Sequence, residues 1–181
     1  MGERIKIGLT GLPGVGKTTT LIKIIEMMER EGWKVGGMIT SSIMENDKRV
    51  GFYVEDWATK RREVLAHVNI DSRVRVGKYG VDIGALERVG VAAIEWAIEN
   101  ADLVVVDEIG KMEVESKKFV DAVKRAFDED KYMILTLHKK SRNPLLQDIR
   151  RRDDIRILEV TPINREVLPY KVVKLIKEEI L

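Results

Sequence analysis

The chain has 181 residues, of which 44% are hydrophobic and 34% are charged, and its 32 basic and 30 acidic side chains leave a formal net charge of +2. This length suits a single domain, 1–181, with a sizeable core, and the balanced charge gives no case for nucleic acid or a membrane as the main partner. The absence of cysteine excludes disulfides, thiolate metal sites and cysteine catalysis.

The sequence also lacks the marks of a membrane or exported protein. No apolar run approaches the roughly 20 residues that a membrane span requires. The first residues, Met1-Gly2-Glu3-Arg4, lead directly into a strand pattern and not into the apolar core of a signal peptide. We therefore expect a cytoplasmic protein, and we expect it to be monomeric.

Two apolar patterns flank a glycine-rich stretch near the amino terminus. Residues 5–9 alternate as a strand does, and apolar residues recur at helical spacing from Leu21 to Met28, before Gly32 supplies a stop. The stretch between the two patterns is Gly11-Leu12-Pro13-Gly14-Val15-Gly16-Lys17-Thr18.

This stretch has the full spacing G-x-x-x-x-G-K-[ST] of a phosphate-binding loop. Its glycines let the backbone turn tightly and bring N–H groups close to phosphate oxygens, and the next helix points its positive end at the same place. In such loops the lysine, here Lys17, reaches the β- and γ-phosphates, and the hydroxyl of Thr18 completes the shell of a Mg²⁺ ion. A glycine-rich turn that binds nothing is the alternative, but the strand before it and the helix after it favour a triphosphate site.

The segment from 34 to 102 is predicted to add one strand of the main sheet and an antiparallel insertion. A strand at 34–41 is followed by a polar turn at 44–49, with Asn46-Asp47 at its tip. Shorter strands at 50–56 and 62–68 then form a hairpin, and 69–80 is less regular. Asp82 is predicted to cap a helix whose apolar side carries Leu86, Val89, Ala93, Ala97 and Ile98.

Strand and helix patterns alternate through the rest of the chain. The β-branched run 103–106 predicts a strand buried on both faces. A helix around 119–127 follows, then a strand at 132–137 that ends at His138, a short basic helix at 144–152, a strand at 155–160 and a final helix at 167–181. This alternation predicts an α/β fold with a doubly wound, mostly parallel sheet and a small antiparallel hairpin insertion.

Acidic residues directly follow the buried run 103–106, in the sequence Asp107-Glu108-Ile109-Gly110-Lys111-Met112-Glu113. Open α/β sheets bind ligands at this end of their strands. Asp107 suits the role of a second Mg²⁺ ligand opposite Thr18, and Glu108 suits a residue that polarises the water aimed at the γ-phosphorus. The alternative is a pair of solvated loop carboxylates.

Three further features near the strand ends are open to two readings each. Glu113 either faces the site or favours the start of the next helix through its dipole. His138 is placed to sense the γ-phosphate or the water, or else it is a half-buried histidine bonded to backbone. The basic stretch 139–152, with Arg150, Arg151 and Arg152 at its end, either closes over phosphates as a lid or forms a solvated face.

Taken together, these motifs resemble the THEP1-type nucleoside-triphosphatases. The likeness runs in order over nearly the whole chain, through 11–18, 76–81, 107–113, His138, and Thr161 with Asn164-Arg165. The resemblance implies a P-loop, RecA-like fold and Mg²⁺-dependent hydrolysis of nucleoside triphosphates to diphosphate and phosphate, with broad tolerance for the base. It further implies that the segment 103–110 contacts the nucleotide, and that Asn164 and Arg165 border the base or ribose.

The chain also departs from this family. Members tend to carry a Thr-x-Glu-Val-Arg run after the second strand, where this chain has Thr40-Ser41-Ser42-Ile43-Met44. If the missing glutamate and arginine position the substrate in relatives, turnover or preference differs here.

Two other functions remain open on the residues alone. A small-molecule or nucleotide kinase would transfer the phosphoryl group to an acceptor held by the insertion between Thr40 and Gly80. A nucleotide-dependent switch would use slow hydrolysis to control binding to a protein or RNA, through the basic stretch 139–152.

Overall fold

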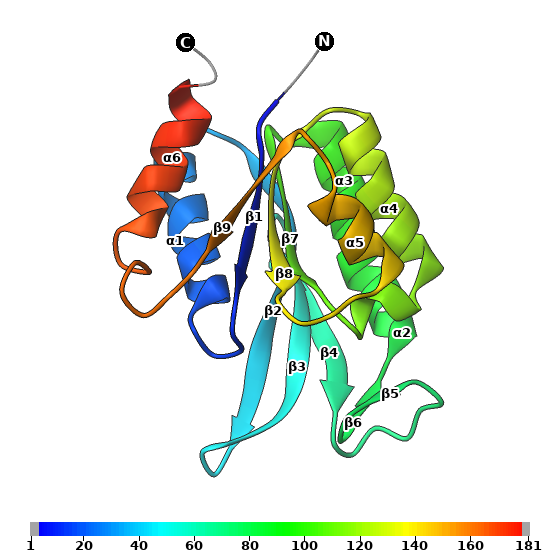
Figure 1. Cartoon of the computed structure of the whole chain (residues 1–181). Helices are drawn as coiled ribbons and strands as arrows, with labels where there is room; N and C mark the ends of the chain where they lie inside the picture. Colours follow the sequence, from blue (N-terminus) through cyan, green and yellow to red (C-terminus); the bar gives the residue numbers. More distant parts are fainter. Residues whose placement is uncertain (1–3, 179–181) are drawn as a thin grey trace.

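The computed structural model describes residues 4–178, which form one nine-stranded sheet covered by helices on both faces (Figure 1). Across the sheet the strands follow the order β5-β6-β4-β3-β2-β7-β8-β1-β9. In chain order they are β1 (Lys6–Gly11), β2 (Val35–Glu45), β3 (Lys48–Asp56), β4 (Arg62–His67), β5 (Arg75–Val76), β6 (Tyr79–Val81), β7 (Leu103–Ile109), β8 (Tyr132–His138) and β9 (Ile155–Glu159).

The five strands β2, β7, β8, β1 and β9 form the parallel part of the sheet. β8 lies between β1 and β7, so the strand that leads into the glycine-rich loop and the strand that carries Asp107 are not neighbours. This is the strand order of the expected RecA-like arrangement. The carboxyl ends of all five strands meet at the edge where open α/β sheets bind their ligands.

The antiparallel part of the sheet is larger than the predicted hairpin. β2 itself turns into β3 through a two-residue turn at Asn46 and Asp47, whose φ angles are 51° and 62°. β3, β4, β6 and β5 then pair antiparallel in succession. The predicted turn at 44–49 was therefore too long, because Asn-Asp at left-handed angles closes a tight hairpin that keeps residues 44, 45, 48 and 49 in strands.

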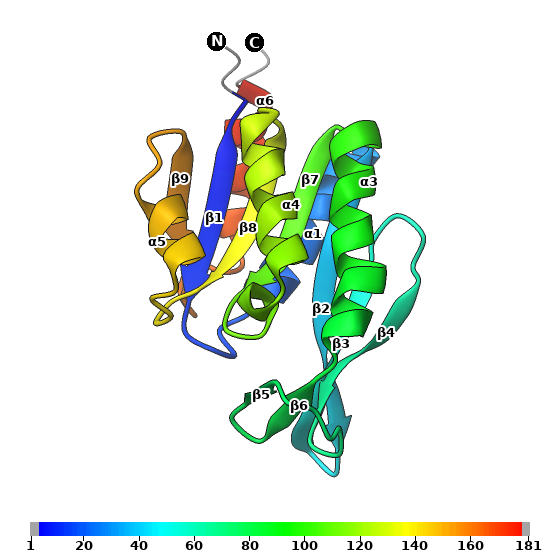
Figure 2. The same ribbon diagram turned by 90° about the vertical axis from the view of Figure 1, so that its right-hand side faces the viewer.

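Helices cover the two faces of the sheet in pairs (Figure 1). α1 (Lys17–Arg30) and α6 (Leu168–Glu178) lie on one face, and α3 (Ala92–Asn100) and α4 (Lys117–Asp128) lie on the other (Figure 2). The shorter helices are α2 (Ile83–Ala85), the π-helical turn η1 (Leu86–Val91), the 3-10 turn η2 (Glu113–Glu115) and α5 (Pro144–Arg150).

The core follows these two layers. Along β7, Leu103 and Val105 pack with the apolar residues of α1 and α6, whereas Val104 and Val106 pack with those of α3 and α4. This explains the continuous β-branched run in the sequence, because a strand covered on both faces buries every side chain.

Most helix ends follow the predicted signals. Asp82 caps α2, and its Oδ1 accepts the N–H of Ala85 at 3.0 Å. Gly32, with φ at 91°, follows α1. α5 ends at Arg150, two residues earlier than predicted. α6 begins at Leu168, and the predicted residues 179–181 lie outside the described part of the chain.

Strand β7 is longer than the apolar run that predicted it. The strand continues to Ile109, so Asp107 and Glu108 belong to it and do not follow it. Asp107 is accommodated in this buried position because a side-chain hydroxyl on the neighbouring strand β8 donates a hydrogen bond to it.

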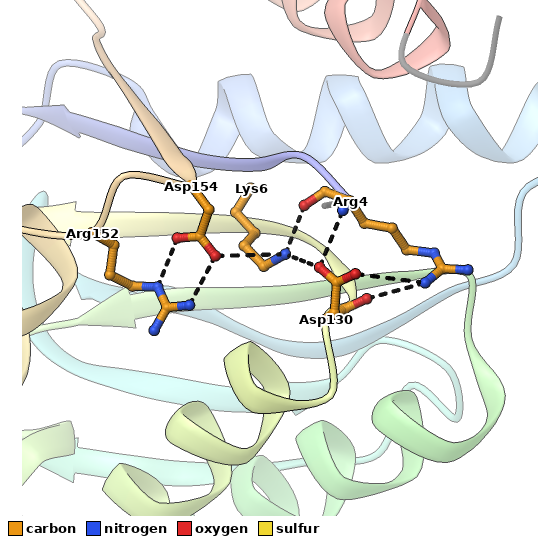
Figure 3. Close-up of polar contacts among 5 residues, drawn as sticks. All are labelled: Arg4, Lys6, Asp130, Arg152 and Asp154. Atoms are coloured by element: carbon orange, nitrogen blue, oxygen red, sulfur yellow. Dashed lines mark hydrogen bonds and ion pairs between the residues drawn. The ribbon is translucent and has the colours of Figure 1, made fainter. Parts of the chain in front are cut away.

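Charged side chains gather around the amino end of β1, far along the strand from the glycine-rich loop (Figure 3). This amino-end cluster consists of Arg4, Lys6, Asp130, Arg152 and Asp154. The ammonium group of Lys6 is fully buried and donates hydrogen bonds of 2.6 Å to Asp130 Oδ1 and to the carbonyl of Arg4. Asp154 lies 4.0 Å from Lys6 Nζ and is bound by Arg152 through two bonds of 2.8 Å. The cluster thus ties β1 to the loops that precede β8 and β9.

Among residues 4–178, no helix is long and apolar enough to cross a membrane.

Candidate functional site

The glycine-rich loop lies between the end of β1 at Gly11 and the start of α1 at Lys17. Gly14 and Gly16 have φ angles of 80° and 108°, in the left-handed region that side-chain-bearing residues avoid. A Cβ at Gly14 would meet no atom within 4 Å, so conformation and not space requires glycine there. The loop therefore has the backbone shape that turns amide groups toward an anion at a helix N-terminus.

Lys17 points across the carboxyl ends of the parallel strands. Its Nζ donates to the carbonyl of Gly11 at 3.1 Å, to Glu108 Oε2 at 3.1 Å and, more weakly, to the carbonyl of Leu137 at 3.4 Å. Its side chain is only 10% exposed. The ammonium group therefore lies between β1, β8 and the acidic end of β7.

Asp107 is buried at the centre of the site and accepts three hydrogen bonds. Thr18 Oγ1 donates to its Oδ2 at 2.9 Å, and Thr136 Oγ1 donates to its Oδ1 at 2.5 Å. The backbone N–H of Thr40, just beyond the part of β2 that pairs with β7, donates to Oδ2 at 3.4 Å. Segments from four elements, α1, β2, β7 and β8, thus converge on one carboxylate. We refer to Lys17, Thr18, Asp107, Glu108 and Thr136 as the carboxyl-end cluster.

Burial is the main cause that raises the pKa of Asp107 to about 6, and the nearby charge of Glu108 adds to it. The bonds from Thr136 and Thr18 act in the opposite direction. A cation beside Asp107 would favour its charged form.

The donor atoms here suit Mg²⁺. The hydroxyl of Thr18 and the carboxylate of Asp107 are hard oxygen ligands within 2.9 Å of each other. Mg²⁺ is usually bound by one or two such groups together with water and substrate phosphates. Within the described residues, no group of three or more His, Cys, Asp or Glu side chains is arranged to hold a metal alone. The residues therefore fit a Mg²⁺ ion that arrives with a polyphosphate.

Glu108 lies at the mouth of the site and is partly exposed. Its side chain is 30% exposed and pairs with Lys17, and the peptide bond that joins it to Asp107 is cis. The exposed part of the carboxyl group can be reached by water, and the ion pair with Lys17 places it beside the glycine-rich loop.

His138 ends β8 beside the same opening. Its Nδ1 accepts the N–H of Ser141 at 3.0 Å, so the proton of the neutral ring lies on Nε2. Burial lowers its pKa, against the opposing charge of Glu108, so the neutral form prevails near pH 7. The ring is half-buried and bonded to backbone, as the second reading expected, and its contact with the γ-phosphate or the water stays a prediction.

The basic stretch after His138 is held in place by its own last turn. Arg150 donates to the carbonyls of His138, Ser141 and Lys139 at 2.8, 2.7 and 3.2 Å. Arg152 pairs with Asp154 in the amino-end cluster. Arg152 therefore has a structural partner at the amino end of the parallel strands, which does not support the lid reading for its side chain. Arg150 is held by backbone carbonyls at the end of β8 where Lys17 also lies, so the lid reading for Arg150 stays a prediction.

Residues 161–165 approach the glycine-rich loop from the last strand. The amide group of Asn164 is used within this loop, where it accepts the N–H of Thr161 at 2.8 Å and donates to the carbonyl of Glu159 at 2.8 Å. Arg165 Nη1 donates to the carbonyl of Val15 at 3.3 Å. Arg165 therefore borders the phosphate loop, and contact of either residue with a base or ribose stays a prediction.

Comparison with known proteins gives one consistent family. A family model described as NTPase matches residues 6–173. A nucleoside-triphosphatase THEP1 from Thermoplasma acidophilum is 40% identical over 175 residues, which are 97% of this chain and 97% of that protein. The chain belongs to the THEP1 nucleoside-triphosphatase family. A THEP1 from Thermofilum pendens is 46% identical over 162 residues, covering 89% of each chain.

Solved structures of this kind share the fold. The crystal structure of THEP1 from the hyperthermophile Aquifex aeolicus has a TM-score of 0.84 at 31% identity, and the match covers 95% of this chain and 99% of that one. The solution structure of a human cancer-related nucleoside triphosphatase has a TM-score of 0.81 at 30% identity, with 96% and 98% covered. The predicted P-loop α/β fold is confirmed.

Reasoning from the sequence missed two members of this THEP1-family site. Thr136 is the only polar residue between Met133 and Leu137 in strand β8, and that contrast is a signal that could have identified it. The N–H of Thr40 carries no side-chain signal, because any residue except proline supplies it.

Proposed function

We propose that this protein hydrolyses nucleoside triphosphates to nucleoside diphosphate and phosphate, with Mg²⁺ and with broad tolerance for the base. One observation carries the proposal. Lys17 Nζ lies 3.1 Å from Glu108 Oε2 while Thr18 Oγ1 lies 2.9 Å from Asp107 Oδ2, so the phosphate loop and the end of β7 meet in one site. The relatives are nucleoside-triphosphatases by name, which supports the same activity.

The residues divide the work of phosphoryl transfer, which consists mainly of charge neutralisation and alignment. The amides of 11–18 and the ammonium of Lys17 bind the β- and γ-phosphates. Thr18 and Asp107 hold the Mg²⁺ ion, which neutralises phosphate charge when bound.

Glu108 acts on the attacking water, and His138 acts on the γ-phosphate. When Lys17 turns to the phosphates, Glu108 loses its ion-pair partner and is free to orient a water molecule and accept its proton. The Nε2–H of His138 donates a hydrogen bond to a phosphate oxygen. Ile109 and Gly110 follow Glu108 in the chain, and because the side chain of Ile109 is buried in the core, this pair faces the nucleotide through its backbone.

Phosphate release from ATP, GTP, CTP and UTP in the presence of Mg²⁺ tests this function. We expect release from all four, and we expect Lys17→Ala to abolish it, because the charge that binds the β- and γ-phosphates is lost. Lys23→Ala, in the same helix, is the matched control and should retain full activity. Full activity of Lys17→Ala would contradict the proposal.

A kinase is the second candidate, because one cavity suits an acceptor. A cavity of about 410 Å³ lies between the β5–β6 hairpin of the insertion, the segment after β7 and the segment after β8. Its lining residues are Arg75, Val76, Gly77, Lys111, Val114, Glu115, Ser141 and Asn143. A phosphorylated product formed from an added alcohol or nucleotide, in place of free phosphate, would favour this candidate.

A nucleotide-dependent switch that binds a protein or RNA stays a prediction. The basic residues Lys139, Lys140, Arg142 and Arg150 line a cavity of about 580 Å³ with Gln147, and a partner captured independently of nucleotide would argue against a switch. A single domain over 1–181, a monomeric state and a cytoplasmic location are also predictions.

A further inference from the structure

Glu113 is buried in a segment whose other charged residues are exposed. Only 6% of Glu113 is accessible to solvent, whereas Lys111 and Glu115 on either side are exposed. Burying a carboxyl group is costly unless it makes hydrogen bonds that its surroundings need. The position of this side chain therefore calls for an explanation beyond the favourable interaction of an acid with the start of α4.

The buried carboxyl group holds the backbone beside Glu108. Glu113 Oε1 accepts the N–H of Gly110 at 3.0 Å. A Cβ placed on Gly110 would lie 3.3 Å from Glu113 Oε1, 3.7 Å from His138 Cβ and 3.9 Å from Glu108 Cδ. The backbone of Gly110 is thus enclosed by Glu113, His138 and the carboxyl group of Glu108.

The residues that follow Glu113 in the chain hold its backbone in place. The N–H of Val114 donates to the carbonyl of Gly110 at 3.3 Å, and the N–H of Ser116 donates to the carbonyl of Glu113 at 3.1 Å. The hydroxyl of Ser116 accepts the N–H of Phe119 at 3.1 Å and so caps α4, and it also donates to Glu87 Oε2 at 2.7 Å. Glu113 therefore joins the rigid start of α4 to the end of β7.

The environment of Glu113 favours the protonated, uncharged form of its carboxyl group. Burial is the first cause that raises its pKa to about 8, and the charge of Glu108 is the second. Asp107 acts in the same direction, and the backbone bonds act against it. Near pH 7 the carboxyl group is uncharged, so it accepts the Gly110 bond without placing a second negative charge beside Glu108.

We propose that Glu113 is a positioning residue for hydrolysis: by holding the amide of Gly110, it fixes the backbone that carries Glu108 and so sets where the Glu108 carboxylate meets the attacking water. This inference rests on the proposed role of Glu108. A base that is misplaced by about 1 Å can lose roughly 100-fold in rate, so a remote hydrogen bond of this kind has a measurable effect on turnover.

The test compares three substitutions at Glu113 with matched controls at Glu115. Glu113→Gln keeps the length, the uncharged state and an acceptor oxygen, and we expect it to retain turnover. Glu113→Met keeps the length without an acceptor, and Glu113→Ala removes both. We expect each of these two to lower kcat by about 10- to 100-fold while KM and the Kd of a non-hydrolysable ATP analogue are unchanged. Glu115→Gln and Glu115→Met should behave as wild type.

The outcomes separate this inference from the proposed function. Turnover is expressed per folded protein, which is measured from the amplitude of the thermal unfolding transition. Wild-type kcat in Glu113→Met, or loss of kcat only in parallel with loss of nucleotide binding, would overturn the positioning role. Glu108→Gln is measured alongside, and full hydrolysis by that variant would overturn the role of Glu108 itself.

Discussion

The parallel strands carry a polar cluster at each end, and the two clusters balance charge in opposite ways. In the amino-end cluster the buried charge is Lys6, and it faces two carboxylates of the same chain at 2.6 and 4.0 Å. In the carboxyl-end cluster the buried charge is Asp107, and its hydrogen-bond partners are two neutral hydroxyls and one backbone amide. Its pKa is raised to about 6, mainly by burial.

This difference distinguishes a cluster with a structural role from one that we propose binds the substrate. A buried ion pair that is complete within the chain holds distant segments in place, and breaking it costs stability. A buried carboxylate that is surrounded by neutral donors and lies next to an anion-binding loop has a perturbed pKa typical of a functional site, and we propose that a cation brought by the substrate would balance its charge. We therefore expect changes at the amino end to affect unfolding and changes at the carboxyl end to affect turnover.

The largest expected effect on stability is from Asp130→Asn. This change leaves the buried ammonium group of Lys6 without its nearest charged partner, and asparagine tolerates the φ angle of 52° at this position. We expect the free energy of unfolding to fall by about 3 kcal/mol, measured by urea denaturation, with kcat unchanged. Asp128→Asn, an exposed neighbour at the end of α4, is the control. A loss of kcat in folded Asp130→Asn protein would contradict the purely structural role of the amino-end cluster.

Lys6→Met sharpens the same test. Methionine has a similar length and removes the buried charge together with its desolvation cost. We expect a smaller loss in the free energy of unfolding than for Asp130→Asn, because the remaining Asp130 is 29% exposed. A larger loss than for Asp130→Asn would contradict this account of the cluster.

The next effect is a pH dependence of stability that comes from Glu113. Its pKa is about 8 in the folded protein against 4.5 for the free side chain, so the unfolded chain loses this proton first as the pH rises. The contribution of Glu113 to the free energy of unfolding is fully present below about pH 4.5 and is lost as the pH rises toward 8. We expect wild type to lose more than about 1.4 kcal/mol relative to Glu113→Gln between pH 5 and pH 8. Parallel stability curves for the two proteins would rule this out.

The smallest effect is expected for Asp154→Asn. Asp154 is 33% exposed and lies 4.0 Å from Lys6 Nζ, so its contribution is close to that of a surface ion pair. We expect a loss of about 0.5 kcal/mol in the free energy of unfolding, compared by urea denaturation with the exposed neighbour in Asp153→Asn. A loss as large as that from Asp130→Asn would show that Lys6 depends equally on both carboxylates.

The sequence predicted the carboxyl-end cluster better than the amino-end cluster. The loop 11–18 and Asp107 follow local patterns, the first in its glycine spacing and the second in its place after a buried run. Lys6, in contrast, lies in the alternating pattern Ile5-Lys6-Ile7, which is typical of a half-exposed strand. Its partner Asp130 is 124 residues away, and no local pattern indicates such a contact.

The limits of prediction within the site have the same cause. Thr136 reaches Asp107 because β8 lies beside β7, and strand order is a property of the whole sheet. The direction of Glu113 depends on how η2 packs between β7 and α4, which the sequence left open. The extension of β7 to Ile109 likewise depends on the neighbouring strand, because Ile109 pairs with Leu137 of β8.

We propose that the carboxyl-end cluster performs hydrolysis. A single-turnover measurement on Glu108→Gln tests this role most directly. The variant is mixed with saturating ATP and Mg²⁺, quenched at successive times and assayed for ADP, after its Kd for ATP has been compared with that of wild type. We predict that the bound ATP stays intact over times in which wild type converts it, with at least about 100-fold slower turnover. Conversion of bound ATP at the wild-type rate would contradict the account.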